Sequence, residues 1–318
     1  GFTNAEGHGD ASTAATEPAP GGQDEPATDL DAATGSDTDA DPFDPRFAGA
    51  RFGVVLHDVL ERSAFERWAQ WTPGSPLPQE DADVIVERLR AGGYPTQDID
   101  DGLAFLAPLV GQTLTVTLPE GVRLADVPAE RRRPEIEFQF ALAPTRVDAL
   151  LALLHRHGLL TTRHGFGLRR KLEGLMTGLI DLTYLHDGRW YVLDYKSNRL
   201  PGYGPAQLAE AMAHSEYQLQ ALIYTLALHR WLRFRLGAAS AGGGYDYDRD
   251  FGGVRYLFCR GLDVTRADVT RADLPQGSMP HGIALHGSAP GVQAWRFAPA
   301  LVDALDALFA GRDTGAAA

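Results

Sequence analysis

The sequence predicts an α/β fold in which strands and helices alternate along one chain, and three observations predict it. Residues 174–198 read as two β-rich runs on either side of Asp187-Gly188, a strong signal for a two-residue hairpin turn. Residues 134–143 alternate between polar and apolar, as in a strand. Apolar residues recur at helical spacing over 52–70, 206–236 and 297–311. The length of 318 residues allows one large domain or two ordinary ones.

The first 48 residues differ in composition from the rest of the chain. Residues 1–50 hold 11 acidic residues and 1 basic residue, whereas the remaining 268 hold 31 and 28. Large apolar side chains are almost absent from this segment, so it cannot bury enough surface to offset the entropy of ordering. We therefore expect a disordered acidic linker or tail over 1–48 and a folded domain over 49–318. A tail that binds a partner is the competing interpretation.

The helical stretch after Phe52 carries an apolar stripe that includes Val55, Leu56 and Val59. His57 lies beside this stripe. A single histidine in a helix is more often structural than a ligand, so the residue pattern alone does not assign His57 to a metal site.

The strand expected over 134–143 follows a mainly helical region over 72–130. It places Glu135 and Glu137 on one face and Phe138 and Phe140 on the other. Either glutamate could belong to a functional site or to a solvated sheet edge, and the pattern leaves both open.

The hairpin over 174–198 places two acids opposite each other. If Asp187-Gly188 forms the turn, Asp181 faces Asp194 across the two strands. Like charges that are roughly 5 Å apart on paired strands repel, and a divalent cation such as Mg²⁺ would remove that repulsion. Lys196 shares the face of Asp194, while Tyr195 points to the other side. Ordinary polar residues on a solvated strand are the competing interpretation.

Two acids, a metal ion and an amine on one face suit phosphodiester hydrolysis. The metal would generate hydroxide from bound water, and the ammonium would stabilise developing negative charge or position the water. Basic residues just before the hairpin could guide a phosphate backbone or form a solvated loop; these are Arg163, Arg169, Arg170 and Lys171.

The remaining features narrow the class of protein. Cys259 is the only cysteine and is expected in the core of a strand over 254–261, so an internal disulfide, a cysteine zinc site and a four-cysteine cluster are excluded. No apolar run of about 18 residues and no signal peptide is visible, which favours a cytoplasmic protein that does not span a membrane. The chain lacks a GxxxxGK[ST] phosphate loop. It begins at Gly1, which favours a fragment of something longer.

The acids and the lysine stand in the order GLIDL and then LDYKSN, which resembles the motif of the PD-(D/E)XK nuclease superfamily. More narrowly, residues 174–235 and the later run YDYDRDFGGVRYLFCRG are similar to the C-terminal nuclease domains of exodeoxyribonuclease V beta subunits, the RecB family. The similarity covers most of the chain after about residue 49. It implies a restriction-endonuclease-like fold, with a mixed central sheet flanked by helices.

The resemblance also implies roles for particular residues. The run Gly53-Val-Val-Leu-His57 matches the family helix whose histidine completes the metal shell, and Glu135 matches its Glu-x-x-Phe strand pattern. Gln220 and Tyr224, one helical turn apart, match the family's Q-x-x-x-Y signature. The implied metal ligands for Mg²⁺ are His57, Asp181, Asp194 and the backbone carbonyl of Tyr195. The implied catalytic residues are Asp181, Asp194, Lys196, Glu135, Gln220 and Tyr224.

The function that the resemblance implies is a Mg²⁺-dependent deoxyribonuclease in a helicase-nuclease complex that acts in double-strand-break repair by recombination. Its expected partners are DNA, as single strands or unwound duplex ends, the other subunits of a RecBCD-like complex, and a recombinase. A non-catalytic docking module of the same fold, which binds helicase subunits or a recombinase, is the alternative. A sequence-reading restriction endonuclease is a third hypothesis, which no DNA-reading motif supports.

Overall fold

The computed structural model describes residues 44–167, 170–214, 217–237, 243–266, 283–284 and 290–312. The predicted tail therefore lies outside the described residues as far as residue 43. Phe47 is already buried at 1% exposure and stacks on Tyr94 and Phe105. Buried contacts thus begin just before residue 49, where we expect the folded domain to start, and that domain division stays a prediction.

The secondary structure alternates between helices and strands, as the sequence predicts. The helices are α1 (Gly49–Arg62), α2 (Gln79–Ala91), α3 (Ile99–Thr115), α4 (Val147–Arg156), α5 (Pro205–His214), α6 (Tyr217–Leu236), α7 (Tyr247–Asp250) and α8 (Pro299–Phe309). The strands are β1 (Arg132–Arg146), β2 (Lys171–His186), β3 (Arg189–Lys196), β4 (Phe251–Phe258), β5 (Ile283–Ala284) and β6 (Val292–Phe297). Within the described residues, no helix combines the length and the apolar character that crossing a membrane requires.

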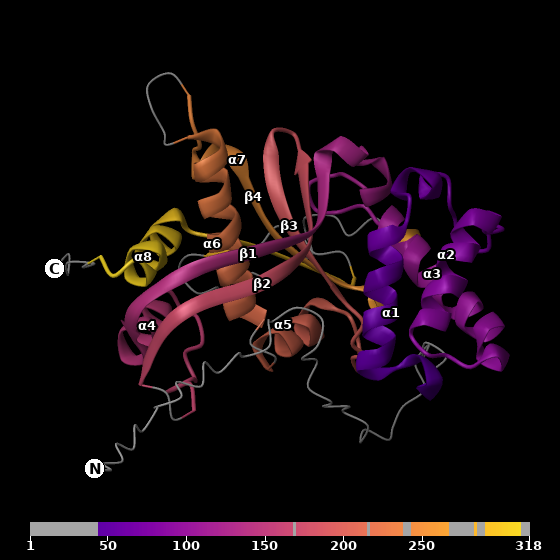
Figure 1. Ribbon diagram of the computed structural model, residues 1–318, viewed down its shortest axis with the longest axis horizontal. Helices are drawn as coiled ribbons and strands as arrows, with labels where there is room; N and C mark the ends of the chain where they lie inside the picture. The colour runs from indigo at the N-terminus through magenta and orange to yellow at the C-terminus, as the bar shows by residue number, and fades with distance from the viewer. Residues whose placement is uncertain are drawn as a thin grey trace, which may run out of the picture.

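The six strands form one mixed sheet in the order β1-β2-β3-β4-β6-β5. Strand β3 pairs with β4 in parallel, and the other neighbours are antiparallel. A parallel pair needs a long crossover, which here contains α5 and α6. Helices flank the sheet (Figure 1), so the predicted mixed central sheet flanked by helices is confirmed.

Two apolar cores pack against the sheet, one on each face. The first joins α1, α2 and α3 to side chains such as Leu193 and Tyr195 of β3. The second joins α4, α5, α6 and α8 to side chains such as Val192 of β3 and Tyr256 of β4. Figure 1 shows α1–α3 gathered at one end of the molecule and α4, α6 and α8 toward the other. Because alternate residues of β3 enter different cores, this strand joins the two halves.

The Asp187-Gly188 turn closes the hairpin as predicted. Both residues have positive φ, 46° and 76°, which a two-residue turn of type I′ requires. The pairing runs from His186–Arg189 to Leu182–Leu193, which is the register counted from the sequence. The predicted register is confirmed up to the pair that precedes the two aspartates.

Two expectations need correction. The single helix expected over 206–236 is two helices, α5 and α6, which pack against each other; residues 215 and 216 between them lie outside the described residues. Of the basic residues before the hairpin, Lys171 does not border the acids. Lys171 begins β2 ten residues before Asp181, which is roughly 33 Å along an extended strand. Residues 168 and 169 lie outside the described part of the chain.

Candidate active site

The site begins where the pairing of β2 with β3 ends. Asp181 and Asp194 are the next residues along the two strands after the Leu182–Leu193 pair. The side chain of Asp181 turns toward β3, and its Oδ2 accepts the backbone N–H of Tyr195 at 2.8 Å. The Asp181 carboxylate thus accepts a backbone N–H of β3 that lies beyond the last pair of β2 with β3. The predicted convergence of the two acids therefore occurs at a fork between strands.

Asp194 and Lys196 face the core that contains α6, while Tyr195 packs with α1 in the other core. Lys196 Nζ lies 2.8 Å from Asp194 Oδ2, and the two side chains are only 10% and 4% exposed. Burial raises the pKa of Asp194 to about 6, with Asp181 adding to the shift and Lys196 opposing it. Burial alone would lower the pKa of Lys196, but Asp194 raises it above its ordinary value, so the amine stays charged.

Helix α6 brings Gln220 and Tyr224 to the same acid and amine. Gln220 Oε1 lies 3.5 Å from Lys196 Nζ, and Gln220 Nε2 donates to the Tyr224 hydroxyl at 3.1 Å. Burial raises the pKa of Tyr224, and a hydrogen bond to Asp194 adds to the rise. The structure therefore joins Asp194, Lys196, Gln220 and Tyr224 in one connected polar group.

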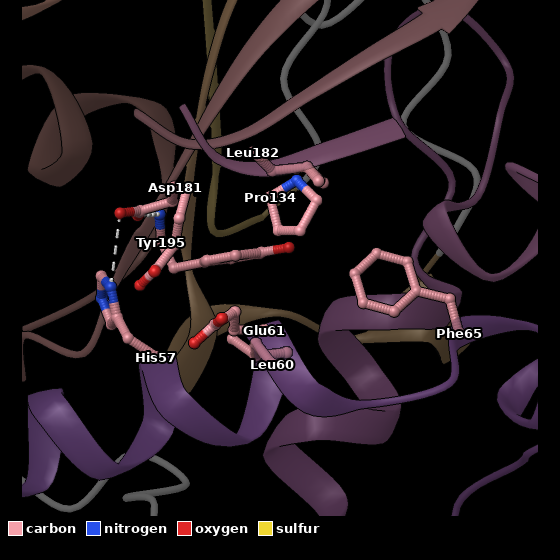
Figure 2. A pocket seen from close by; sticks show the side chains of 9 residues that line it. His57, Leu60, Glu61, Phe65, Pro134, Asp181, Leu182 and Tyr195 are labelled. Carbon is pink, nitrogen blue, oxygen red and sulfur yellow. Dashed lines mark hydrogen bonds and ion pairs between the residues drawn. The ribbon is translucent and has the colours of Figure 1, made fainter. Parts of the chain in front are cut away.

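Helix α1 supplies His57 from the other side of the fork. Its Nδ1 lies 3.5 Å from Asp181 Oδ1, and its ring contacts the ring of Tyr195 edge-on (Figure 2). Burial alone would lower the pKa of His57, but the Asp181 carboxylate outweighs burial and raises it to about 9. The same contact lowers the pKa of Asp181 against the effect of burial. His57 therefore lies beside Asp181, and its role as a metal ligand stays a prediction.

Glu135 lies across from Asp181 on β1, because it falls between the pairs Pro134–Leu182 and Ile136–Ile180. Its φ of 47° is rare for a residue with a side chain. Burial, Glu61 and Asp181 together raise the pKa of Glu135. Of the two glutamates that the sequence left open, Glu135 is the one beside the acids.

A small cavity of about 20 Å³, enough for one water-sized sphere, is lined by His57, Glu135 and Asp181 of these groups. Its lining residues come from α1, the 3-10 helix Phe65–Trp68 that follows it, β1, β2 and β3 (Figure 2): His57, Leu60, Glu61, Phe65, Pro134, Glu135, Asp181, Leu182 and Tyr195. Glu61 is the residue that the sequence analysis missed. The available signal was its position four residues after His57, which puts both on one face of α1.

The fit of these residues to a divalent cation rests on the two carboxylates at the fork. Asp194 Oδ2 is buried, and the Lys196 ammonium lies 2.8 Å from it. Among the described residues, no group of three or more His, Cys, Asp and Glu side chains is arranged to hold a metal ion. Mg²⁺ commonly binds one or two carboxylates and keeps several waters. Asp181 and Asp194 supply that type of donor.

The thiol of Cys259 is a core side chain. Cys259 follows β4 and is 1% exposed, and burial raises the pKa of its thiol to about 12. The prediction of a core cysteine is confirmed.

Comparison with known proteins agrees with this geometry. A model of the PD-(D/E)XK nuclease superfamily matches residues 33–274. The chain is 33% identical to RecBCD enzyme subunit RecB of Escherichia coli K12 over 225 residues, which are 68% of this chain and 17% of that protein. It is 32% identical to RecBCD enzyme subunit RecB of Mycobacterium tuberculosis H37Rv over 289 residues, 80% of this chain and 24% of that protein. The matched region thus spans about a fifth of the length of these relatives.

Proposed function

Because this chain belongs to the PD-(D/E)XK nuclease superfamily and is homologous to part of RecB, we propose that it is a Mg²⁺-dependent deoxyribonuclease domain that hydrolyses DNA phosphodiester bonds. The observation that carries the proposal is the fork between β2 and β3. The buried Asp194 and the partly buried Asp181 meet there, with a charged lysine on the first and a histidine on the second. Mutually repelling acids in a buried place are typical of sites that bind a cation.

In the proposed mechanism, Asp181 and Asp194 would hold Mg²⁺ together with His57 and the backbone carbonyl of Tyr195. The bound ion would supply a hydroxide nucleophile at neutral pH and neutralise charge on the phosphoryl oxygens. Lys196 keeps its proton beside Asp194 and presents it to the attacking water or to the developing negative charge. His57 must lose its own proton to act as a ligand, so binding of the ion and release of that proton are linked.

Glu135, Gln220 and Tyr224 complete the proposed catalytic set. Glu135 adds negative charge on the β1 side of Asp181, where its raised pKa reflects a crowded acidic environment. Gln220 and Tyr224 lie on the α6 side of the site, where they link α6 to Lys196 and Asp194.

We further propose that the chain is the nuclease part of a helicase-nuclease complex of the exodeoxyribonuclease V type. The similarity to RecB proteins, named as subunits of the RecBCD enzyme, supports a role in recombinational repair of DNA double-strand breaks. The partners would be DNA, as single strands or unwound duplex ends, the other subunits and a recombinase, all in the cytoplasm. Residues 49–318 would form the nuclease domain, and residues 1–48 the linker that precedes it.

A docking module without catalysis is the weaker candidate. A module that only docks has no need to keep a buried acid and a buried amine, Asp194 and Lys196, which are costly to desolvate. Here Asp181, Asp194 and Lys196 are all present: Asp194 pairs with Lys196, and Asp181 accepts the backbone N–H of Tyr195, the residue between them.

The proposal is tested by incubating the purified chain with end-labelled linear DNA, single- and double-stranded, in Mg²⁺ or in EDTA. We expect cleavage in Mg²⁺ alone. Asp181→Asn and Asp194→Asn should each abolish it, since both variants keep the side-chain shape but lose the charge that holds the ion. The matched control is Asp303→Asn, which alters an exposed acid on α8, away from the fork. Folding is checked by circular dichroism, and full Mg²⁺-dependent cleavage by a folded Asp194→Asn variant would overturn the assignment.

A further inference from the structure

The ammonium of Lys196 lies in a cage that the motif residues only partly explain. Besides Asp194 and Gln220, it faces the ring of Tyr217 at 4.3 Å and the ring of Tyr256 at 5.5 Å, both measured to the ring centroid. The two rings stack on each other, with centroids 5.6 Å apart. Aromatic faces attract a cation, and more strongly when it is desolvated as here.

Gln220 is the amide side chain that contacts the Lys196 ammonium. Its Oε1 is approached by two donors, Lys196 at 3.5 Å and the Tyr256 hydroxyl at 3.0 Å, while its Nε2 donates to Tyr224. A flipped amide would turn two N–H groups toward the ammonium and the Tyr256 hydroxyl, and the acceptor would be lost. The amide therefore has one orientation that satisfies all three neighbours.

Tyr256 is well suited to enforce that orientation. It is fully buried on β4, and it lies beside Asp194 in the parallel pairing of β3 with β4. Its hydroxyl carries one proton, and Gln220 Oε1 is the closer acceptor, at 3.0 Å against 3.3 Å for the backbone oxygen of Tyr217. The donor thus comes from a central strand of the sheet and not from α6, which carries Gln220.

We propose that Tyr256 is a positioning residue for the nuclease reaction, and that it acts through Gln220 to hold the Lys196 ammonium at Asp194. This inference rests on the proposed function and deepens it. The Tyr256 hydroxyl fixes the amide oxygen of Gln220, and that oxygen and Asp194 Oδ2 hold the ammonium from two sides. Neither Tyr256 nor its hydroxyl touches the reacting atoms in this scheme.

The test removes only the hydroxyl. Tyr256→Phe is compared with Tyr247→Phe, since Tyr247 is also buried and donates its hydroxyl to a backbone oxygen, that of Phe297, at 2.8 Å. Tyr247 precedes β4, at the opposite end of that strand from the residues that pair with Lys196. Both variants lose one buried hydrogen bond, so similar shifts in melting temperature are expected, but only one of the lost bonds lies at the site.

For Tyr256→Phe we expect kcat for DNA cleavage in Mg²⁺ to fall by about tenfold or more, with KM within about twofold of wild type, because misplacing a catalytic group lowers the rate of the chemical step. Tyr247→Phe should keep the wild-type kcat. In a Gln220→Met background, Tyr256→Phe should change kcat by less than about twofold, because the residue through which it acts is absent. Gln220→Ala replaces Gln220→Met if the latter does not fold.

Three outcomes separate the possibilities. Equal kcat values for wild type and folded Tyr256→Phe would overturn the positioning role while leaving the nuclease proposal intact. An effect of Tyr256→Phe that is just as large in the Gln220→Met background would show that Tyr256 does not act through Gln220, which also overturns the inference. If the wild-type chain itself does not cleave DNA in Mg²⁺, the proposed function fails, and this inference fails with it.

Discussion

The buried pair of Asp194 and Lys196 gives a stability prediction that does not depend on cleavage. Lys196→Met keeps the length of the side chain but removes the charge, and so leaves Asp194 buried near Asp181. Breaking a buried ion pair by removing one partner costs about 3–5 kcal/mol. At pH 7 the stranded carboxyl can instead take up a proton, which for an ordinary carboxyl costs at most about 4 kcal/mol. We therefore expect Lys196→Met to lower the free energy of unfolding by about 3 kcal/mol.

A double variant, in which Asp194 is neutralised as well, tests whether the two charges stabilise each other. In Asp194→Asn/Lys196→Met neither buried charge remains, so the free energy of unfolding should return to within about 1 kcal/mol of wild type. The assay is urea unfolding followed by circular dichroism at pH 7, in EDTA so that divalent ions do not contribute. A double variant as unstable as Lys196→Met alone would refute the reasoning, because it would mean that the two charges do not stabilise each other.

Repeating the measurement in Mg²⁺ connects this stability cycle to the proposed metal site. An ion that binds only the folded chain stabilises it by about 2.7 kcal/mol at a hundredfold excess over Kd. Wild type should gain this stability. Lys196→Met, which keeps both acids, should also gain, whereas the double variant should gain little. Equal gains in all three proteins would show that the ion does not bind at Asp194.

Two further predictions concern acids outside the motif. Glu61→Gln removes a charge from the cavity beside Asp181. It should raise the Mg²⁺ concentration for half-maximal cleavage about tenfold, since one nearby charge in a partly buried site is worth about 1–2 kcal/mol. Glu87→Gln, at an exposed position of α2, is the matched control, and equal Mg²⁺ dependence in the two variants would exclude a role for Glu61. Asp306 on α8 is 4% exposed and pairs with Arg230, Arg233 and Arg312. Asp306→Asn should therefore lower the free energy of unfolding by about 2 kcal/mol at pH 7. The exposed control Asp303→Asn should change this free energy little. Burial opposes a lowered pKa of Asp306, but Arg230 and Arg233 outweigh it and hold that pKa below 3.8. The stabilisation by Asp306 is therefore present above pH 3.8 and lost as pH falls through the folded-state pKa. A difference in unfolding free energy between wild type and Asp306→Asn that stays constant from pH 7 to pH 2 would contradict this prediction.

Local signals account for the parts of the site that the sequence predicts. The Asp187-Gly188 turn and the two-residue period of strands fix which residues face each other, so the meeting of Asp181 and Asp194 follows from counting. The period of a helix places Gln220 and Tyr224 on one face in the same way. These arguments need only residues that are close in the sequence.

The parts that the sequence did not predict depend on distant pairing. Tyr256 reaches Gln220 because β4 lies parallel to β3, a contact between segments about sixty residues apart. Phe47 was assigned to the tail because residues 1–48 hold few large apolar side chains, yet it is buried against Tyr94 and Phe105 from a later part of the chain. Glu61 is the exception, since helical spacing from His57 was sufficient to find it.

The position of the site between two cores implies that its geometry depends on how those cores are held together. His57 comes from the core around α1, and Lys196 and Gln220 from the core around α6, so any shift between them separates the histidine from the amine. Arg260 opposes such a shift. Its buried guanidinium donates to the backbone oxygens of Phe47, just before α1, and of Ser197, directly after Lys196. Since backbone oxygens cannot change rotamer, these bonds fix the entry to α1 against the end of β3. Arg260 therefore adds to β3 a second link between the two halves, which lies outside the motif and supports the placement of His57 over the fork.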